Sequence, residues 1–201
     1  MTKSKFLFFL FFFILFISGA QDQYLIDSLS KELKHIEAFR LEMGDDASAS
    51  KDTLEADILK QLGLELIFVN PETALDYFQK SLDLSTHAKF KPGIAAAHKN
   101  IGVCYTNMGD YPNGLIHYFA ALEINKELND QKGIASIYNN LGNVYSYQGD
   151  YSSALNYFLE ALKIRQSIGD KKGIAASYNN IGSIYGFQSN YPEALKYQQE
   201  S

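Results

Sequence analysis

Apolar residues recur at three- and four-residue steps along most of the chain beyond residue 24, the spacing that places them on one face of an α-helix. Within residues 93–107 this face is formed by Ile94, His98, Ile101 and Tyr105. A second stripe follows at Leu115, Tyr118, Ala121 and Leu122. The alternating pattern of a strand is not found. The sequence therefore predicts an all-α chain of paired helices.

The pairs belong to an internal repeat of forty residues, the strongest signal in the sequence. Residues 93–132 and 133–172 are identical at fifteen of forty positions. Residues 173–201 match the start of the same unit and stop before its end, and residues 53–92 form a degenerate copy. The predicted domains are thus four repeats, at 53–92, 93–132, 133–172 and 173–201, with the last incomplete.

Local signals mark the ends of the helices and their contacts. The second helix of each repeat is predicted to begin at Asp110, Asp150 or Asn190, whose side chains can accept hydrogen bonds from the free amides of a first turn. The first helix carries a glycine despite its cost of about 1 kcal/mol relative to alanine. The sequence therefore predicts close approach of the partner helix at three positions: Gly102, Gly142 and Gly182.

The two ends of the chain differ from the repeats. Residues 1–20 combine two early lysines, an apolar run from Phe6 to Ile17 and small residues at 18–20, which predicts a signal peptide and an exported, periplasmic or secreted, protein. A membrane anchor is the alternative, but the run is shorter than the roughly 20 residues of a spanning helix. Residues 21–52 are predicted to hold an N-terminal capping helix, from 24 to about 41, and a linker. At the other end the last helix is expected to continue in a longer protein or to be covered by another chain, so self-association through that end is open.

The repeat resembles the tetratricopeptide repeat family in a long, forty-residue variant. The apolar-Gly-x-x-Tyr core of the family's first helix is similar to Leu141-Gly142 with Tyr145, and its second-helix pattern is similar to Ala154, Phe158 and Ala161. This resemblance implies an α-α superhelix of antiparallel helix pairs. It also implies a concave groove, lined by first helices, that binds an extended peptide or a partner protein.

On the family's pattern the inward positions carry a lysine and a ladder of asparagines, followed by an aromatic. The predicted peptide-binding residues are Lys99, Asn100, Asn139, Asn140, Asn143, Tyr147, Asn179 and Asn180. An amide both donates and accepts hydrogen bonds, which suits the backbone of an extended peptide. The alternative is that the asparagines bond between neighbouring repeats and fix the stacking angle. Because only Lys99 supplies a cation there, a carboxylate clamp of the chaperone-binding kind is not predicted.

Charge and motifs exclude several other functions. The net charge of −5 and the absence of a basic stripe argue against nucleic-acid binding. The four histidines are isolated in sequence, no phosphate-binding or nucleophile motif occurs, and Cys104 falls at an apolar position, so neither catalysis, a metal nor a cofactor is expected. The predicted function is a non-catalytic interaction scaffold. The alternative is the N-terminal sensory region of a longer bacterial signalling protein, such as a histidine kinase, cyclase or transcription regulator.

Overall fold

The computed structural model describes residues 23–35, 38 and 49–201 of the chain. The described residues form helices and short turns, with no strand among them, which confirms the predicted all-α class. The chain divides into two compact units, Met1–Ala88 and Lys89–Ser201. The predicted signal peptide, residues 1–20, lies outside the described residues, so export stays a prediction.

The first unit contains a helix over residues 23–35, then α2 (Ala49–Leu66) and α3 (Pro71–His87). Leu29 and Leu33 of the first of these helices pack with a cluster on α2, as the predicted capping helix requires. The start of α2 at Ala49 lies inside residues 21–52, which the sequence predicts to hold the capping helix and a linker. The helix α2 thus begins about one turn before residue 53, where the degenerate repeat is predicted to start.

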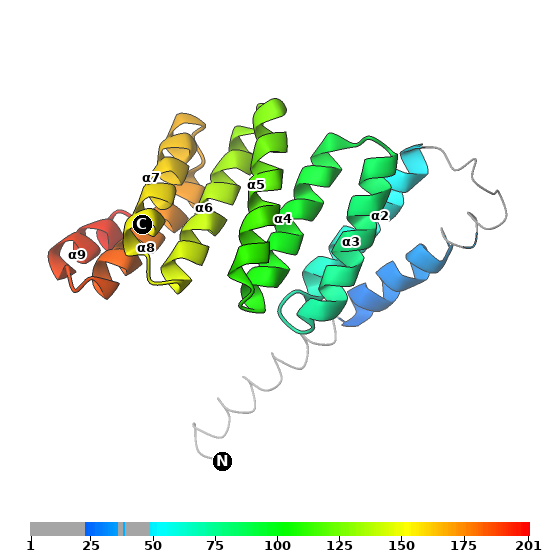
Figure 1. Cartoon of the computed structure of the whole chain (residues 1–201), viewed down its shortest axis with the longest axis horizontal. Coiled ribbons are helices and arrows are strands. Elements are labelled where there is room, and N and C mark those ends of the chain that lie inside the picture. The colour runs from blue at the N-terminus through cyan, green and yellow to red at the C-terminus, as the bar shows by residue number, and fades with distance from the viewer. Residues whose placement is uncertain (1–22, 36–37, 39–48) are drawn as a thin grey trace, which may run out of the picture. The chain divides into compact units, whose positions relative to one another are not determined.

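The second unit consists of three consecutive helix pairs, drawn from green to red in Figure 1. Their bounds are α4 (Lys91–Asn107), α5 (Tyr111–Glu127), α6 (Gln131–Tyr147), α7 (Tyr151–Ser167), α8 (Lys171–Phe187) and α9 (Tyr191–Gln199). Within each pair the two helices pack together, α5 and α7 each contact the first helix of the next pair, and α4 also contacts α6. The forty-residue unit of the sequence is therefore one helix pair of the fold.

Aspartates define where these helices begin. Asp110 and Asp150 cap α5 and α7 as predicted, each accepting a hydrogen bond from the backbone amide three residues later, at 3.2 and 3.0 Å. Asp130 and Asp170 cap the first helices α6 and α8 in the same way, a role that the sequence analysis gave only to second helices. Asn190 begins α9 without a side-chain bond. Four of the six helices in the second unit thus begin with an aspartate cap.

Two glycines of the first helices, Gly102 and Gly142, lie against aromatic rings of the second helices. A methyl group at Gly102 would lie 2.7 Å from the ring of Tyr118, and one at Gly142 would lie 2.6 Å from the ring of Phe158. Both rings are buried and cannot withdraw. The predicted close approach is confirmed at Gly102 and Gly142. At Gly182 the contact is looser, because Gln198 stands in place of the ring and a methyl group would meet the backbone oxygen of Ala194 at 3.2 Å.

Two further features of the fold concern the cysteine and the hydrophobicity of the helices. Cys104 is fully buried among apolar residues, as its position in the repeat predicts. Within the part of the chain that the structure describes, no helix is both long and apolar enough to cross a membrane.

Candidate functional site

The predicted peptide-binding residues lie on the first helices α4, α6 and α8, but they are not equally accessible. Asn100 is only 3% exposed, whereas Asn179 is exposed and the remaining asparagines are half-buried. Tyr147, at the C-terminal end of α6, is 63% exposed. Asn100 is therefore part of the interior, and any surface formed by the ladder consists mainly of residues from α6 and α8.

One pair of the ladder connects neighbouring repeats. Asn180 of α8 donates from Nδ2 to Oδ1 of Asn139 on α6 over 2.9 Å. The same oxygen accepts a second hydrogen bond from Nη1 of Arg165, at 3.3 Å. This is the arrangement expected if asparagines fix the stacking of repeats. For Asn139 and Asn180, a structural role is thus visible alongside the predicted binding role.

The exposed aromatics pair across repeats. Tyr147 stacks on Tyr111, with ring centroids 6.2 Å apart, and Phe187 stacks on Tyr151 at 5.7 Å. In both pairs the covering ring, Tyr147 or Phe187, is the last residue of a first helix. The ring beneath it is the first residue of the second helix of the preceding repeat. The aromatic rings therefore help to set the repeat spacing and still present one face to solvent.

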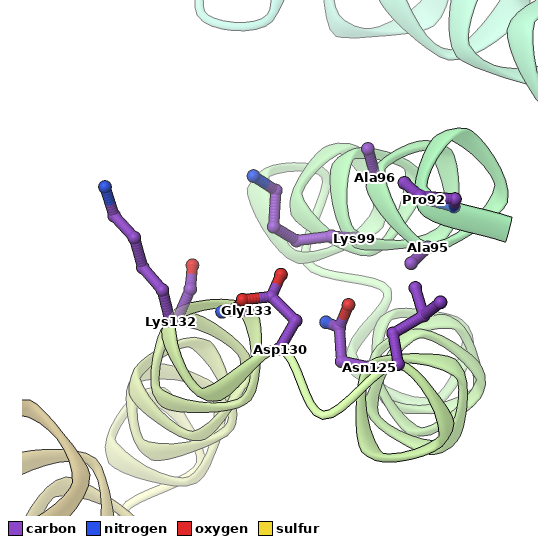
Figure 2. Close-up of a pocket in the computed structure, with 10 residues that line it drawn as sticks. Pro92, Ala95, Ala96, Lys99, Asn125, Asp130, Lys132 and Gly133 are labelled. Atoms are coloured by element: carbon purple, nitrogen blue, oxygen red, sulfur yellow. Dashed lines mark hydrogen bonds between the residues drawn. The ribbon is translucent and has the colours of Figure 1, made fainter. Parts of the chain in front are cut away.

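A cavity of about 510 Å³ opens between α4 and α6 over the C-terminal end of α5 (Figure 2). Three elements line it, and its residues are Pro92, Ala95, Ala96, Lys99, Asn125, Leu128, Asp130, Lys132, Gly133 and Ser136. Lys99 is the one residue of the predicted set among them. The volume lies within the range of about 300–1,000 Å³ typical of ligand pockets.

The cavity has polar and apolar parts: Pro92, Ala95 and Ala96 of α4 form most of the apolar part, while Lys99 of the same helix faces polar residues at the end of α5 and the start of α6. Figure 2 shows the carboxylate of Asp130 and the amide of Asn125 turned toward α4, with Lys99 above the carboxylate. Oδ1 of Asp130 is already engaged, because it accepts the backbone amide of Gly133 at 3.0 Å as the cap of α6. The Lys132 side chain extends away from the cavity in Figure 2, so the charged groups that face the cavity are Asp130 and Lys99.

The sequence analysis missed most of this cavity. Asn125, Asp130 and Ser136 were not predicted as site residues, since each is an ordinary polar residue of a helix end. One signal was available in the repeat itself: residue 165, forty positions beyond Asn125, is an arginine. A change of size and charge at one position of an otherwise regular repeat indicates where two junctions differ.

The histidines are not all isolated in space. His98 of α4 and His117 of α5 face each other with Nδ1 atoms 3.0 Å apart, and Nδ1 of His87 lies 2.6 Å from Oδ2 of Asp52. Burial lowers the pKa of His98 and of His117, and for His98 the neighbouring imidazole lowers the pKa further. Among the described residues there is no group of three or more His, Cys, Asp or Glu side chains arranged to hold a metal ion.

Comparison with known families identifies the repeat. A family model described as Tetratricopeptide repeat matches residues 93–167 and, in a second overlapping position, residues 133–201. Together these matches span residues 93–201, more than half of the chain. The matched region coincides with the three helix pairs of the second unit.

Individual relatives resemble parts of the chain. A stretch of 53 residues is 42% identical to Response regulator aspartate phosphatase I of Bacillus subtilis (strain 168), and the match covers 26% of this chain and 14% of the phosphatase. The crystal structure of BtubC from P. vanneervenii is similar with a TM-score of 0.69 at 20% identity, over 89% of this chain and 76% of that chain.

A Rap protein, solved in complex with Competence and Sporulation Factor, is similar with the same TM-score and identity, over 85% of this chain and 47% of that chain. At these identities the likeness of the solved structures is one of fold. The chain spans less than half of the length of the Rap protein and a small fraction of the phosphatase.

Proposed function

Because the chain belongs to the tetratricopeptide repeat family, a fold of interaction scaffolds that is generally non-catalytic, we propose that it binds an extended segment of a partner protein along the first-helix face of α4, α6 and α8. The observation that carries this proposal is the cavity of about 510 Å³ on that face, formed where two first helices meet the end of α5. Concave, partly apolar sites with a few polar groups are where proteins bind ligands.

The half-buried asparagines of α6 extend this surface beyond the cavity. Asn140 and Asn143 lie one helical turn apart, on the same helix as the cavity residues Lys132, Gly133 and Ser136. Each amide can exchange hydrogen bonds with a peptide backbone, at a net gain of about 0.5–1.5 kcal/mol per bond. The asparagines would therefore add affinity without selecting sequence, and the cavity would add selection.

The fold neighbours agree with this type of partner. One of them, the Rap protein, was solved with Competence and Sporulation Factor bound. That complex belongs to the neighbour, and for this chain it supports only the general proposal of a polypeptide ligand.

The test is a binding measurement with a substitution pair on α6. Peptides that bind the full chain are selected from a random display library and labelled. Their affinities are then measured by fluorescence anisotropy. Asn140→Ala with Asn143→Ala should weaken binding by about tenfold, which corresponds to about 1.4 kcal/mol. The melting temperature should stay nearly unchanged, because neither residue forms the bond between Asn139 and Asn180.

A matched control uses an asparagine of a second helix. Asn156→Ala on α7, an exposed residue outside the first-helix face, should leave affinity unchanged. If the Asn140/Asn143 pair binds the selected peptides as tightly as the parent chain does, or if Asn156→Ala weakens binding equally, the first-helix face is not the binding surface.

A further inference from the structure

His98 of α4 and His117 of α5 bring two imidazole nitrogens together inside the first helix pair of the second unit. Their Nδ1 atoms lie 3.0 Å apart, and the ring centroids lie 5.2 Å apart with the ring planes tilted by 40°. Without a metal, one Nδ1 must carry a hydrogen and donate it to the other, since two bare nitrogens would repel each other at this distance. Each imidazole therefore turns its Nδ1 toward the same small space between the two helices.

The separation of the two nitrogens matches that of two ligands on one metal ion. Imidazole nitrogens bind transition metals at about 2.0 Å, so two of them lie about 2.8 Å apart at a right angle and about 3.3 Å apart at a tetrahedral angle. The observed 3.0 Å lies between these values. A small rotation of each ring about its soft Cβ–Cγ torsion directs both lone pairs at one ion. The helices can therefore stay where they are.

Both histidines stand where the other repeats have tyrosine, and they do so together. The same two positions hold Tyr138 and Tyr157 in the next repeat, with ring centroids 5.9 Å apart. Two phenols fill the space there, so packing alone does not require imidazoles. A single substitution would leave one histidine beside one tyrosine, whereas this chain has both imidazoles in one repeat. The paired change at one contact indicates that the two imidazoles act together.

The surroundings keep the imidazoles neutral and within reach of solvent. Both residues are half-buried. Burial lowers the pKa of His98 and of His117, and the neighbouring imidazole lowers the pKa of His98 further, so the neutral form that binds metals predominates at about pH 7. Tyr105 stacks on His117 with centroids 5.6 Å apart, which restrains that ring.

We propose that His98 and His117 form a two-imidazole site for a transition metal ion, with Cu²⁺ bound most tightly. Two nitrogens near a right angle suit the tetragonal geometry of Cu²⁺, and divalent ions bind such ligands in an order that places Cu²⁺ above Ni²⁺ and Zn²⁺. On binding, the imidazole that donates from Nδ1 takes the tautomer with its hydrogen on Nε2, so no proton is released overall. Water fills the other coordination positions. The site is separate from the proposed peptide-binding surface, because neither histidine lines the cavity.

The test is a titration of the full chain, without a histidine tag, with Cu²⁺ in a buffer that does not bind metals. Electron paramagnetic resonance and visible absorption follow the binding. The parent chain should bind one Cu²⁺ whose spectrum shows coupling to two nitrogens. His98→Tyr with His117→Tyr, which copies the next repeat, should lose this signal. Ni²⁺ and Zn²⁺ should compete only at higher concentration, and Mg²⁺, which prefers oxygen ligands, should not compete.

Two further variants separate metal binding from packing. His98→Asn keeps an N–H donor toward His117 but replaces an imidazole with an amide, a poor metal ligand, so it should retain the fold and lose the two-nitrogen signal. The control changes the other two histidines of the chain, His35→Asn with His87→Asn, and should bind Cu²⁺ as the parent does. In that control the new amide at position 87 can still donate to Asp52, the partner of His87.

The outcomes decide the proposal. Equal Cu²⁺ binding by the parent and by His98→Asn, or a parent spectrum without coupling to two nitrogens, would overturn it. So would loss of the signal in the His35/His87 control, since the ligands would then lie elsewhere. A rise in melting temperature on adding Zn²⁺ to the parent, absent in His98→Asn, would support it, because an ion that binds only the folded state stabilises that state. Peptide affinity tests the proposed function separately and should not depend on the metal.

Discussion

In repeat 133–172 the space between the two helices holds three tyrosine rings, because Tyr138 and Tyr145 both pack on Tyr157 with centroids 5.9 and 5.4 Å apart. Repeat 173–201 has the same trio, around Tyr197. In repeat 93–132 two of the three positions are His98 and His117. The backbone is the same, so the helix pair accepts imidazoles or phenols of similar size. What changes is the response to protons, since only the imidazoles titrate near neutral pH.

A second difference between the repeats is the buried aromatic ring that packs against the glycine of the first helix. In repeat 93–132 the buried ring is Tyr118, and its hydroxyl lies 3.3 Å from Oγ1 of Thr106, which donates to the carbonyl of Gly102 at 2.8 Å. Burial raises the pKa of Tyr118 to about 12, against a smaller lowering by its bond with Thr106. In repeat 133–172 the ring is Phe158 and has no hydroxyl to satisfy. The buried ring of repeat 93–132 therefore needs a polar partner, whereas that of repeat 133–172 does not.

This polar pair accounts for a glycine. Gly114 occupies the position of Ala154, and a methyl group there would lie 2.8 Å from Oγ1 of Thr106. The comparison shows that substitutions within one repeat are matched to one another. Features shared by both repeats, such as the first-helix glycine and the aspartate caps, set the backbone. Features that differ set polarity and proton binding.

The largest effect is expected at the shared glycine of the first helix. Gly142→Leu should destabilise the fold by about 1–3 kcal/mol or more, because the leucine side chain would overlap with the buried ring of Phe158. Gly102→Leu should cost a similar amount against Tyr118. The measurement is the free energy of unfolding by denaturant, followed by circular dichroism.

Two glycines of α8, Gly182 and Gly186, test whether the loss of stability follows the closeness of the contact. Gly182→Leu should destabilise the fold less than Gly142→Leu does, because a methyl group at Gly182 would lie 3.2 Å from its nearest atom. At Gly186 a methyl group would have no neighbour within 4 Å. Gly186→Leu is the control and should be neutral or stabilising, as leucine favours a helix. Equal losses at Gly142 and Gly186 would contradict the role of close packing.

An intermediate effect is expected at Gly114. Gly114→Ala should not give the gain of about 1 kcal/mol that alanine normally gives in a helix, because the methyl group meets Thr106. Together with Thr106→Ala, the same change should be more stable than the sum of the single effects, by about 1 kcal/mol. A double-mutant cycle of unfolding free energies measures this coupling. Strict additivity would show that Gly114 is not matched to Thr106.

The smallest effect is expected from the histidine pair. The pKa values of His98 and His117 lie below the ordinary value of about 6.5, so the unfolded chain binds protons more readily than the folded chain. Their contribution to stability is therefore complete above about pH 6.5 and decreases as the pH falls through that value toward the folded pKa values. Facing the pair is Tyr105, stacked on His117 at 5.6 Å.

The control converts this repeat to the pattern of the other two. The variant His98→Tyr with His117→Tyr should show a flatter dependence of unfolding free energy on pH between about 7.5 and 5.5 than the parent chain. All other residues are the same in both proteins, so the difference between the two pH dependences reports on the histidine pair. Identical pH slopes would mean that the pair does not couple folding to protons.

Much of the fold was predictable because its causes are local and repeated. The helix pairs, the start of α5 and α7 at Asp110 and Asp150, and the crowding at Gly142 each follow from a few neighbouring residues. The additional caps at Asp130 and Asp170 follow the same rule and could have been found by it. The ladder of asparagines was predicted as a set, but its members differ in exposure because the packing of neighbouring repeats decides which of them is covered.

By itself, the sequence determined the helical class, the forty-residue unit, the family and the places where helices must touch, since periodicity and glycine positions act over one or two turns. Only the tertiary structure decided that Asn139 bonds to Asn180, that His98 meets His117, and that a cavity opens between α4 and α6. These contacts join residues that are nineteen to forty-one positions apart in sequence. The physical reason is reach: whether a side chain crosses a junction depends on its length and on what the opposite helix presents.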